Sequence, residues 1–151
     1  MQPRNGLRSI ALLGAVLALA VAGSALAAGS AKPTISFTSP MRGAKTTSAV
    51  TFKVKIAHFT ICAACVGKAN KANTGHLHFA MDGGKLDYPK YSGANGKLAV
   101  QLGIAGKYSP AVLPQITYAH LPKGKHTLWV FVVNNDHSNT GVKASTTIWV
   151  K

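Results

Sequence analysis

The feature that most constrains the fold is a regular alternation of apolar and polar residues between positions 50 and 57. In the segment VTFKVKIA, every second residue from Val50 to Ile56 is apolar, and threonine or lysine lies between them. An extended chain places successive side chains on opposite faces, so this period of two is typical of a β-strand. We therefore predict a strand with one buried face and one face in water.

Further strand-like runs follow at short intervals, separated by turns rich in Gly, Pro, Asn, Asp and Ser. This spacing predicts an all-β domain, a single seven-stranded sandwich of the immunoglobulin-like or fibronectin-like kind, with no amphipathic helix. The sixth run is apolar on both faces, which indicates a central strand. The expected strands are 34–38, 49–57, 75–84 with its closing turn, 98–104, 115–121, 126–135 and 142–151.

Alternation also assigns faces within the third expected strand, GHLHFAM. Its apolar face includes Phe79, and the opposite face carries His76 and His78. We expect Phe79 to pack in the interior against Val54 and Val130. This assignment places the two histidines on the outer side of the sheet.

The first 27 residues are expected to be a cleaved signal peptide. Two arginines precede an apolar run, Ile10–Gly23, and small residues lead to a cleavage site after Ala27. The run is shorter than the ~20 residues needed to span a bilayer, so we expect no membrane span in the mature form. We expect residues 28–33 to be a short lead-in, residues 34–151 to form the domain, and the protein to be secreted or periplasmic.

The chain is strongly basic, with 17 Lys and Arg against three aspartates. The leader contains two of the 17, so 15 remain against three acids, a formal charge of +12. Three aspartates are too few for a glycosidase carboxylate pair or for an oxygen cage around Ca²⁺. Arg42 is the only arginine after the leader, so no specific nucleic-acid partner is expected. The charge instead favours attraction to anionic polymers of the cell envelope.

No catalytic motif is present. Ser138 follows His137 directly, but neighbours in one turn do not form a catalytic triad, and the nucleophile motif G-x-S-x-G is missing. We therefore expect a binding module and not an enzyme.

The histidines are the candidate metal ligands. His76 and His78 lie two residues apart on one strand face, about 6 to 7 Å apart at Cα. The topology expected for the sandwich brings His137, in the turn after the sixth strand, to the same end. Imidazole is the commonest metal ligand, so these three predict a Cu or Zn site, with Asp136 orienting a ring from outside. The alternative is that the histidines form only structural hydrogen bonds.

Cys62 and Cys65 form a C-x-x-C motif that has three interpretations. An exported chain favours a local disulfide between them. Together with His76 and His78 they also have the spacing of a tetrahedral Cys₂His₂ zinc site, and free thiols are the third alternative. His58 is expected at the same end of the domain and is a further candidate ligand.

Three segments of the chain, GHLHF, LPKGKHTL and NNDHS, resemble signatures of a group of small secreted bacterial Ig-like β-sandwich domains. The resemblance covers nearly the whole chain after the leader and implies the same sandwich fold, but the group has no settled biochemical function.

DHSNTG and TTIWVK are more weakly similar to periplasmic copper-resistance chaperones. That similarity implies an exported β-sandwich with few histidine ligands. Only Met41 and Met81 follow the leader, so a thioether site for Cu⁺ is not expected.

Two hypotheses about function remain from the sequence. In the first, the protein is a monomeric, non-enzymatic module that binds Cu or Zn through histidines at one end of the sandwich. In the second, it is a cell-envelope adhesion or scaffolding module that its basic surface attracts to anionic polymers. In that case the histidines are structural only.

Overall fold

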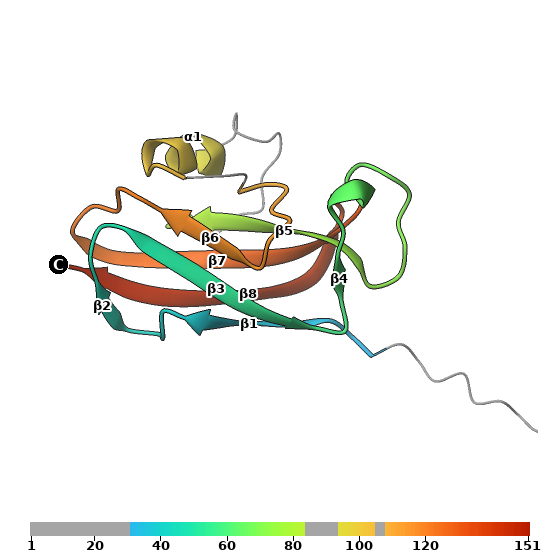
Figure 1. Cartoon of the computed structure of the whole chain (residues 1–151), viewed down its shortest axis with the longest axis horizontal. Helices are drawn as coiled ribbons and strands as arrows, with labels where there is room; N and C mark the ends of the chain where they lie inside the picture. Colours follow the sequence, from blue (N-terminus) through green and yellow to red (C-terminus); the bar gives the residue numbers. More distant parts are fainter. Residues whose placement is uncertain (1–30, 84–93, 105–107) are drawn as a thin grey trace, which may run out of the picture.

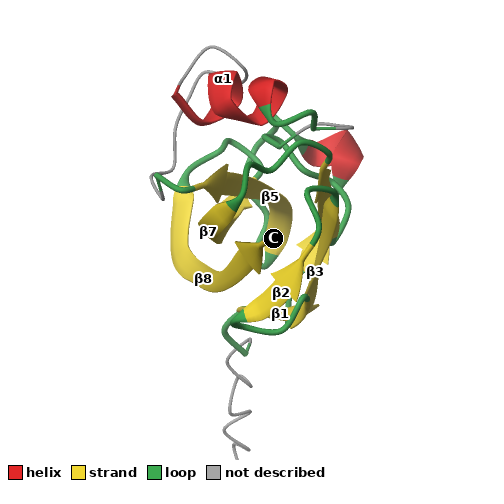
Figure 2. Cartoon of the chain, turned by 90° about the vertical axis from the view of Figure 1, so that its left-hand side faces the viewer, coloured by secondary structure: helices red, strands yellow, loops and turns green. Residues whose placement is uncertain are grey.

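The computed structural model describes residues 31–83, 94–104 and 108–151, which form two β-sheets around an apolar core (Figures 1 and 2). The expected signal peptide lies outside these residues. The smaller sheet has the strand order β1 (Thr34–Ser39), β3 (Val50–Ala57), β6 (Gln115–Tyr118). The larger sheet has the order β2 (Ala44–Thr46), β8 (Asn139–Val150), β7 (Gly124–Asn134), β5 (Thr74–Met81), β4 (Thr60–Ile61). β2 and β4 run parallel to their neighbours, and the other pairs are antiparallel.

The alternation in β3 has the predicted effect on burial. Val50, Phe52 and Val54 are buried, whereas the residues between them are exposed. The Phe52 ring packs edge-to-face against Phe37 of β1 and Tyr118 of β6, so aromatic contacts cross the inner side of the smaller sheet. The prediction for this strand is confirmed.

The predicted interior position of Phe79 is also confirmed. Phe79 is 1% exposed and belongs to the same buried cluster as Val54 and Val130. The opposite face of the larger sheet carries a second buried cluster, made by Ala80, Phe131 and Val133 with Trp129 packed against it. β5 and β7 therefore have apolar packing on both sides.

The chain forms a helix where a fourth strand was expected at 98–104. α1 (Ala94–Gln101) lies beside β5, on the side of the molecule away from β1 and β2 (Figure 1). The strand prediction is wrong because Leu98, Ala99 and Leu102 have helical spacing and together pack against the core.

The described residues contain eight strands instead of seven. One expected strand is the helix, and two strands, β2 and β4, were not expected, because with three and two residues they are too short to give a periodic signal. No helix among the described residues is long and apolar enough to cross a membrane.

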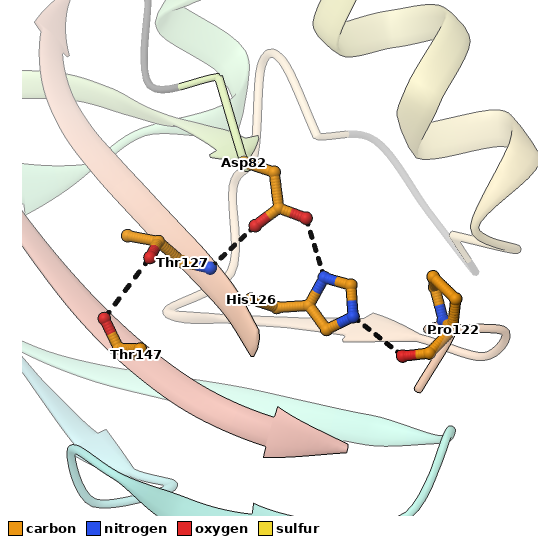
Figure 3. A network of polar contacts seen from close by, with 5 residues as sticks. All are labelled: Asp82, Pro122, His126, Thr127 and Thr147. Carbon is orange, nitrogen blue, oxygen red and sulfur yellow. Dashed lines mark hydrogen bonds and ion pairs between the residues drawn. The ribbon is translucent and has the colours of Figure 1, made fainter. Parts of the chain in front are cut away.

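A polar network fixes the C-terminal end of β5 (Figure 3). The Asp82 carboxylate accepts a hydrogen bond from the Thr127 backbone N–H at 2.7 Å and pairs with Nδ1 of His126 at 2.6 Å. Nε2 of His126 donates to the Pro122 carbonyl at 2.7 Å. Both ring nitrogens of His126 therefore have an oxygen partner, one on the side chain of Asp82 and one on the backbone of Pro122. β5 is thus held at the end opposite to His76.

Candidate metal centre

β5 brings His76 and His78 to the outer face of the larger sheet. His76 pairs with Val133 of β7, and His78 pairs with Phe131. Both histidine side chains are buried, with at most 2% exposure. A Cβ at Gly75 would overlap the Val133 carbonyl oxygen, so a glycine directly before His76 lets β5 lie this close to β7.

The third histidine, His137, comes from the turn between β7 and β8. Its backbone has φ = 71°, in the left-handed region that residues other than glycine rarely adopt. Hydrogen bonds hold this conformation: His137 N donates to the Asn134 carbonyl, and Asn134 N donates to the Ser138 carbonyl. The His137 ring lies 4.5 Å from the His76 ring, centroid to centroid.

One nitrogen from each ring points toward a common centre. His76 Nε2 lies 3.1 Å from His78 Nε2 and 2.9 Å from His137 Nδ1, and the third side of the triangle measures 3.4 Å. A tetrahedral Zn²⁺ with Zn–N bonds of about 2.0 to 2.1 Å separates its nitrogen ligands by about 3.3 Å. The triangle of nitrogens therefore has the size of one face of the ligand tetrahedron around a zinc ion. In the described part of the chain, no other group of three His, Cys, Asp or Glu residues has this geometry.

Burial also keeps the ligand atoms in the protonation state that metals require. The pKa of His76 is lowered to about 4, first by burial and then by the nearby His137. The pKa of His78 is lowered to about 3 by burial and by both neighbouring histidines. Both rings are therefore neutral at pH 7 and have a lone pair to donate.

Ser109 contacts the cluster, and sequence reasoning missed it. Its Oγ is buried and lies 3.0 Å from Nδ1 and 3.1 Å from Nε2 of His78. The segment carrying Ser109 lies along the edge of β5 beyond the short strand β4, where Ala111 and Leu77 exchange backbone hydrogen bonds. This pairing joins residues far apart in the chain, so no local motif indicated it.

Asp136 was expected to orient a histidine ring, but its contacts lie elsewhere. Its Oδ1 accepts hydrogen bonds from the Ser138 backbone N–H at 2.9 Å and from the Ser138 hydroxyl at 2.6 Å. These bonds lower the pKa of the Asp136 carboxyl. Among the described residues, Asp136 therefore shapes the turn that carries His137 and does not touch a ring.

The remaining candidate ligands do not join the cluster. Cys62 and Cys65 form a disulfide with each other, so the Cys₂His₂ zinc site and the free-thiol alternative are both wrong. His58 is exposed and lies outside the three-histidine group.

No family model, curated protein or solved structure matches the chain. The resemblances seen in the sequence stay predictions, and the geometry of the residues carries the functional argument.

Proposed function

We propose that the protein is a secreted or periplasmic, non-enzymatic module that binds one transition-metal ion through His76, His78 and His137. The observation that carries this proposal is the convergence of three imidazole nitrogens within 3.4 Å of one another. Hydrogen bonds between the rings would need a proton for each pair, whereas one cation uses all three lone pairs at once. Burial and the lowered pKa values of His76 and His78 keep these two rings neutral, which is the form that donates a lone pair to a cation.

The shape of the triangle favours particular ions. Its three edges are similar, as in a tetrahedral site. A square-planar Cu²⁺ site would place two of the nitrogens opposite each other at about 4 Å. We therefore propose Zn²⁺ or Cu⁺ ahead of square-planar Cu²⁺. Three protein ligands leave a fourth position at the ion for water or another small ligand.

The distribution of carboxylates favours binding over hydrolysis. Asp82 and Asp136 are the only acids in the described residues. Asp82 is paired with His126 at the far end of β5, and Asp136 accepts hydrogen bonds from Ser138. Within the described residues, neither carboxylate is placed to act as a general base at the histidine cluster.

Titration of the purified protein with Zn²⁺ at about pH 7.5 tests the proposal. We expect one ion per chain by calorimetry and an unfolding temperature that rises with Zn²⁺ concentration, because the ion binds only the native state. A His76→Gln, His78→Gln double variant should lose both signals, and His58→Asn should keep them. The proposal fails if wild type binds neither Zn²⁺ nor anaerobically supplied Cu⁺.

A second candidate function, attachment to anionic polymers, rests on the outer face of the smaller sheet. Lys53 and Lys55 are exposed there, and the register places Ser36 beside Lys55 and Gln115 beside Lys53. β1, β3 and β6 contain no acidic residue. This face is basic and carries several hydroxyl groups, which favours contact with a phosphate-bearing or acidic polymer.

A further inference from the structure

The loop that contains the disulfide contacts both of the elements that supply histidines. At its start, the Cys62 backbone N–H donates to the Gly75 carbonyl at 2.8 Å, directly before His76 on β5. Five residues later, the Gly67 N–H donates to the Asn135 carbonyl at 2.7 Å, two residues before His137. One short segment therefore links the two halves of the candidate site.

Two more hydrogen bonds tie the loop to the turn that carries His137. The Asn135 side-chain amide donates to the Ala69 carbonyl at 2.9 Å, and Asn135 is almost fully buried. The Asp136 backbone N–H donates to the Asn70 side-chain oxygen at 3.0 Å. The turn is therefore held by the loop on one side while its own hydrogen bonds hold His137 in the left-handed conformation.

The disulfide lies between these two sets of contacts. Cys62 and Cys65 enclose the short 3₁₀ turn Ala63–Cys65, and the Gly67 contact follows two residues later. A covalent cross-link of this kind removes conformations that the open chain would sample. With the bridge closed, the segment that joins the anchor on β5 to the anchor on the turn has fewer conformations available.

We propose that the Cys62–Cys65 disulfide controls the affinity of the histidine cluster for its metal ion, an inference that rests on the proposed function. Metal affinity depends on how well the ligands are already positioned, because binding otherwise has to order them. Opening the bridge frees the segment that spaces His76 from His137. The oxidised protein then binds the ion tightly, and the reduced protein binds it weakly.

The redox step is ordinary thiol–disulfide exchange with an exogenous dithiol. One thiolate of the dithiol attacks a cysteine sulfur, the S–S bond breaks, and a mixed disulfide forms. The second thiol resolves it, so the dithiol becomes a disulfide while the two cysteines gain two electrons and two protons. Cys62 and Cys65 are only partly buried, so a reductant can reach them.

The test compares Zn²⁺ affinities of the oxidised wild type, a Cys62→Ala, Cys65→Ala variant and phosphine-reduced wild type desalted anaerobically. The variant is needed because free thiols can bind Zn²⁺ themselves. We expect the variant to bind about 10- to 100-fold more weakly, the range seen when supporting contacts of a metal site are lost. Asn70→Ala keeps the bridge but removes one contact to the turn, and its Zn²⁺ affinity should fall roughly threefold.

Asp82→Asn is the matched control, because it breaks the ion pair with His126 at the opposite end of β5. We expect it to lower global stability but to leave Zn²⁺ affinity within about twofold of wild type, since distant sites act independently. Equal affinity of the disulfide-free variant and wild type would overturn the inference and leave the proposed function standing. If that variant does not fold, unchanged Zn²⁺ affinity overturns it in wild type that is reduced and then alkylated at both cysteines, which removes sulfur as a Zn²⁺ ligand. Absence of Zn²⁺ and Cu⁺ binding by oxidised wild type overturns the proposed function itself.

Discussion

Nε2 of His76 lies 2.9 Å from Nδ1 of His137, although 61 residues separate them in the chain. His76 is fixed within the hydrogen-bonded ladder between β5 and β7, whereas His137 comes from the turn that follows β7. The two candidate ligands therefore depend on different parts of the fold. We expect that the histidine in the turn can be replaced with little effect on the sheet.

Replacing His137 with Asn separates ligand loss from folding. Asn tolerates the left-handed conformation that His137 adopts, so the turn should persist. We expect Zn²⁺ affinity to fall at least about 100-fold, more than for loss of a supporting contact. The unfolding temperature without metal should stay within a few degrees of wild type.

His58→Asn is the control for that substitution. His58 also has a left-handed backbone, with φ = 57°, but it is exposed and outside the cluster. Zn²⁺ affinity equal to wild type in His137→Asn would show that the turn histidine is not a ligand.

The lowered pKa values of His76 and His78 predict how the stability of the metal-free protein changes with pH. In the unfolded chain both rings titrate near 6.5, but in the folded protein they titrate at about 4 and about 3. Below pH 6.5 the unfolded chain therefore binds protons that the folded protein does not, and the free energy of unfolding decreases. Their contribution is complete above pH 6.5 and is lost progressively as pH falls to about 4 and about 3.

Urea unfolding in the presence of a chelator, between about pH 7.5 and about pH 4.5, measures this loss. Each histidine accounts for up to about 1.4 kcal/mol per pH unit within its window. His78→Gln should show a shallower dependence than wild type. Parallel curves for the two proteins would contradict the lowered pKa of His78.

Phe79→Ala tests the assignment of faces in β5. Phe79 is fully buried in the interior cluster, so its truncation should lower the free energy of unfolding by about 3 to 5 kcal/mol in urea titrations. Met41, which is 73% exposed, provides the comparison, and Met41→Ala should change stability by less than about 0.5 kcal/mol. Similar small effects at both positions would place Phe79 outside the core.

The basic outer face of the smaller sheet makes a separate prediction. Binding to long-chain polyphosphate should weaken strongly as salt rises to 0.15 M, because exposed charges are screened over about 8 Å there. Lys53→Gln, Lys55→Gln should reduce this binding more than Lys123→Gln, Lys125→Gln, an exposed pair of lysines outside this face. The His76→Gln, His78→Gln variant should bind the polymer as wild type does. An equal loss of polyphosphate binding in the two double variants would show that binding depends only on overall charge.

The sequence by itself determined the features that follow from local periodicity. The alternation in 50–57 predicts β3, and the spacing of His76 and His78 places them on one strand face, because a strand turns by half a revolution per residue. The same reasoning located Phe79 in the interior, whereas His137 was indicated as a candidate third ligand by the expected sandwich topology and not by local periodicity.

Only the tertiary structure decided the features that depend on residues distant in sequence. The run at 98–104 has a weak pattern, and packing against the core selected a helix over a strand. The contact of Ser109 with His78 depends on a segment pairing with the side of β5, and Asp136 is directed to its own turn by Ser138. The C-x-x-C motif fits either a disulfide or a metal site, because its spacing is the same in both. Folding resolves that choice by bringing the two sulfurs together, and the three histidine nitrogens converge because β5 and the turn meet at one end of the sheet.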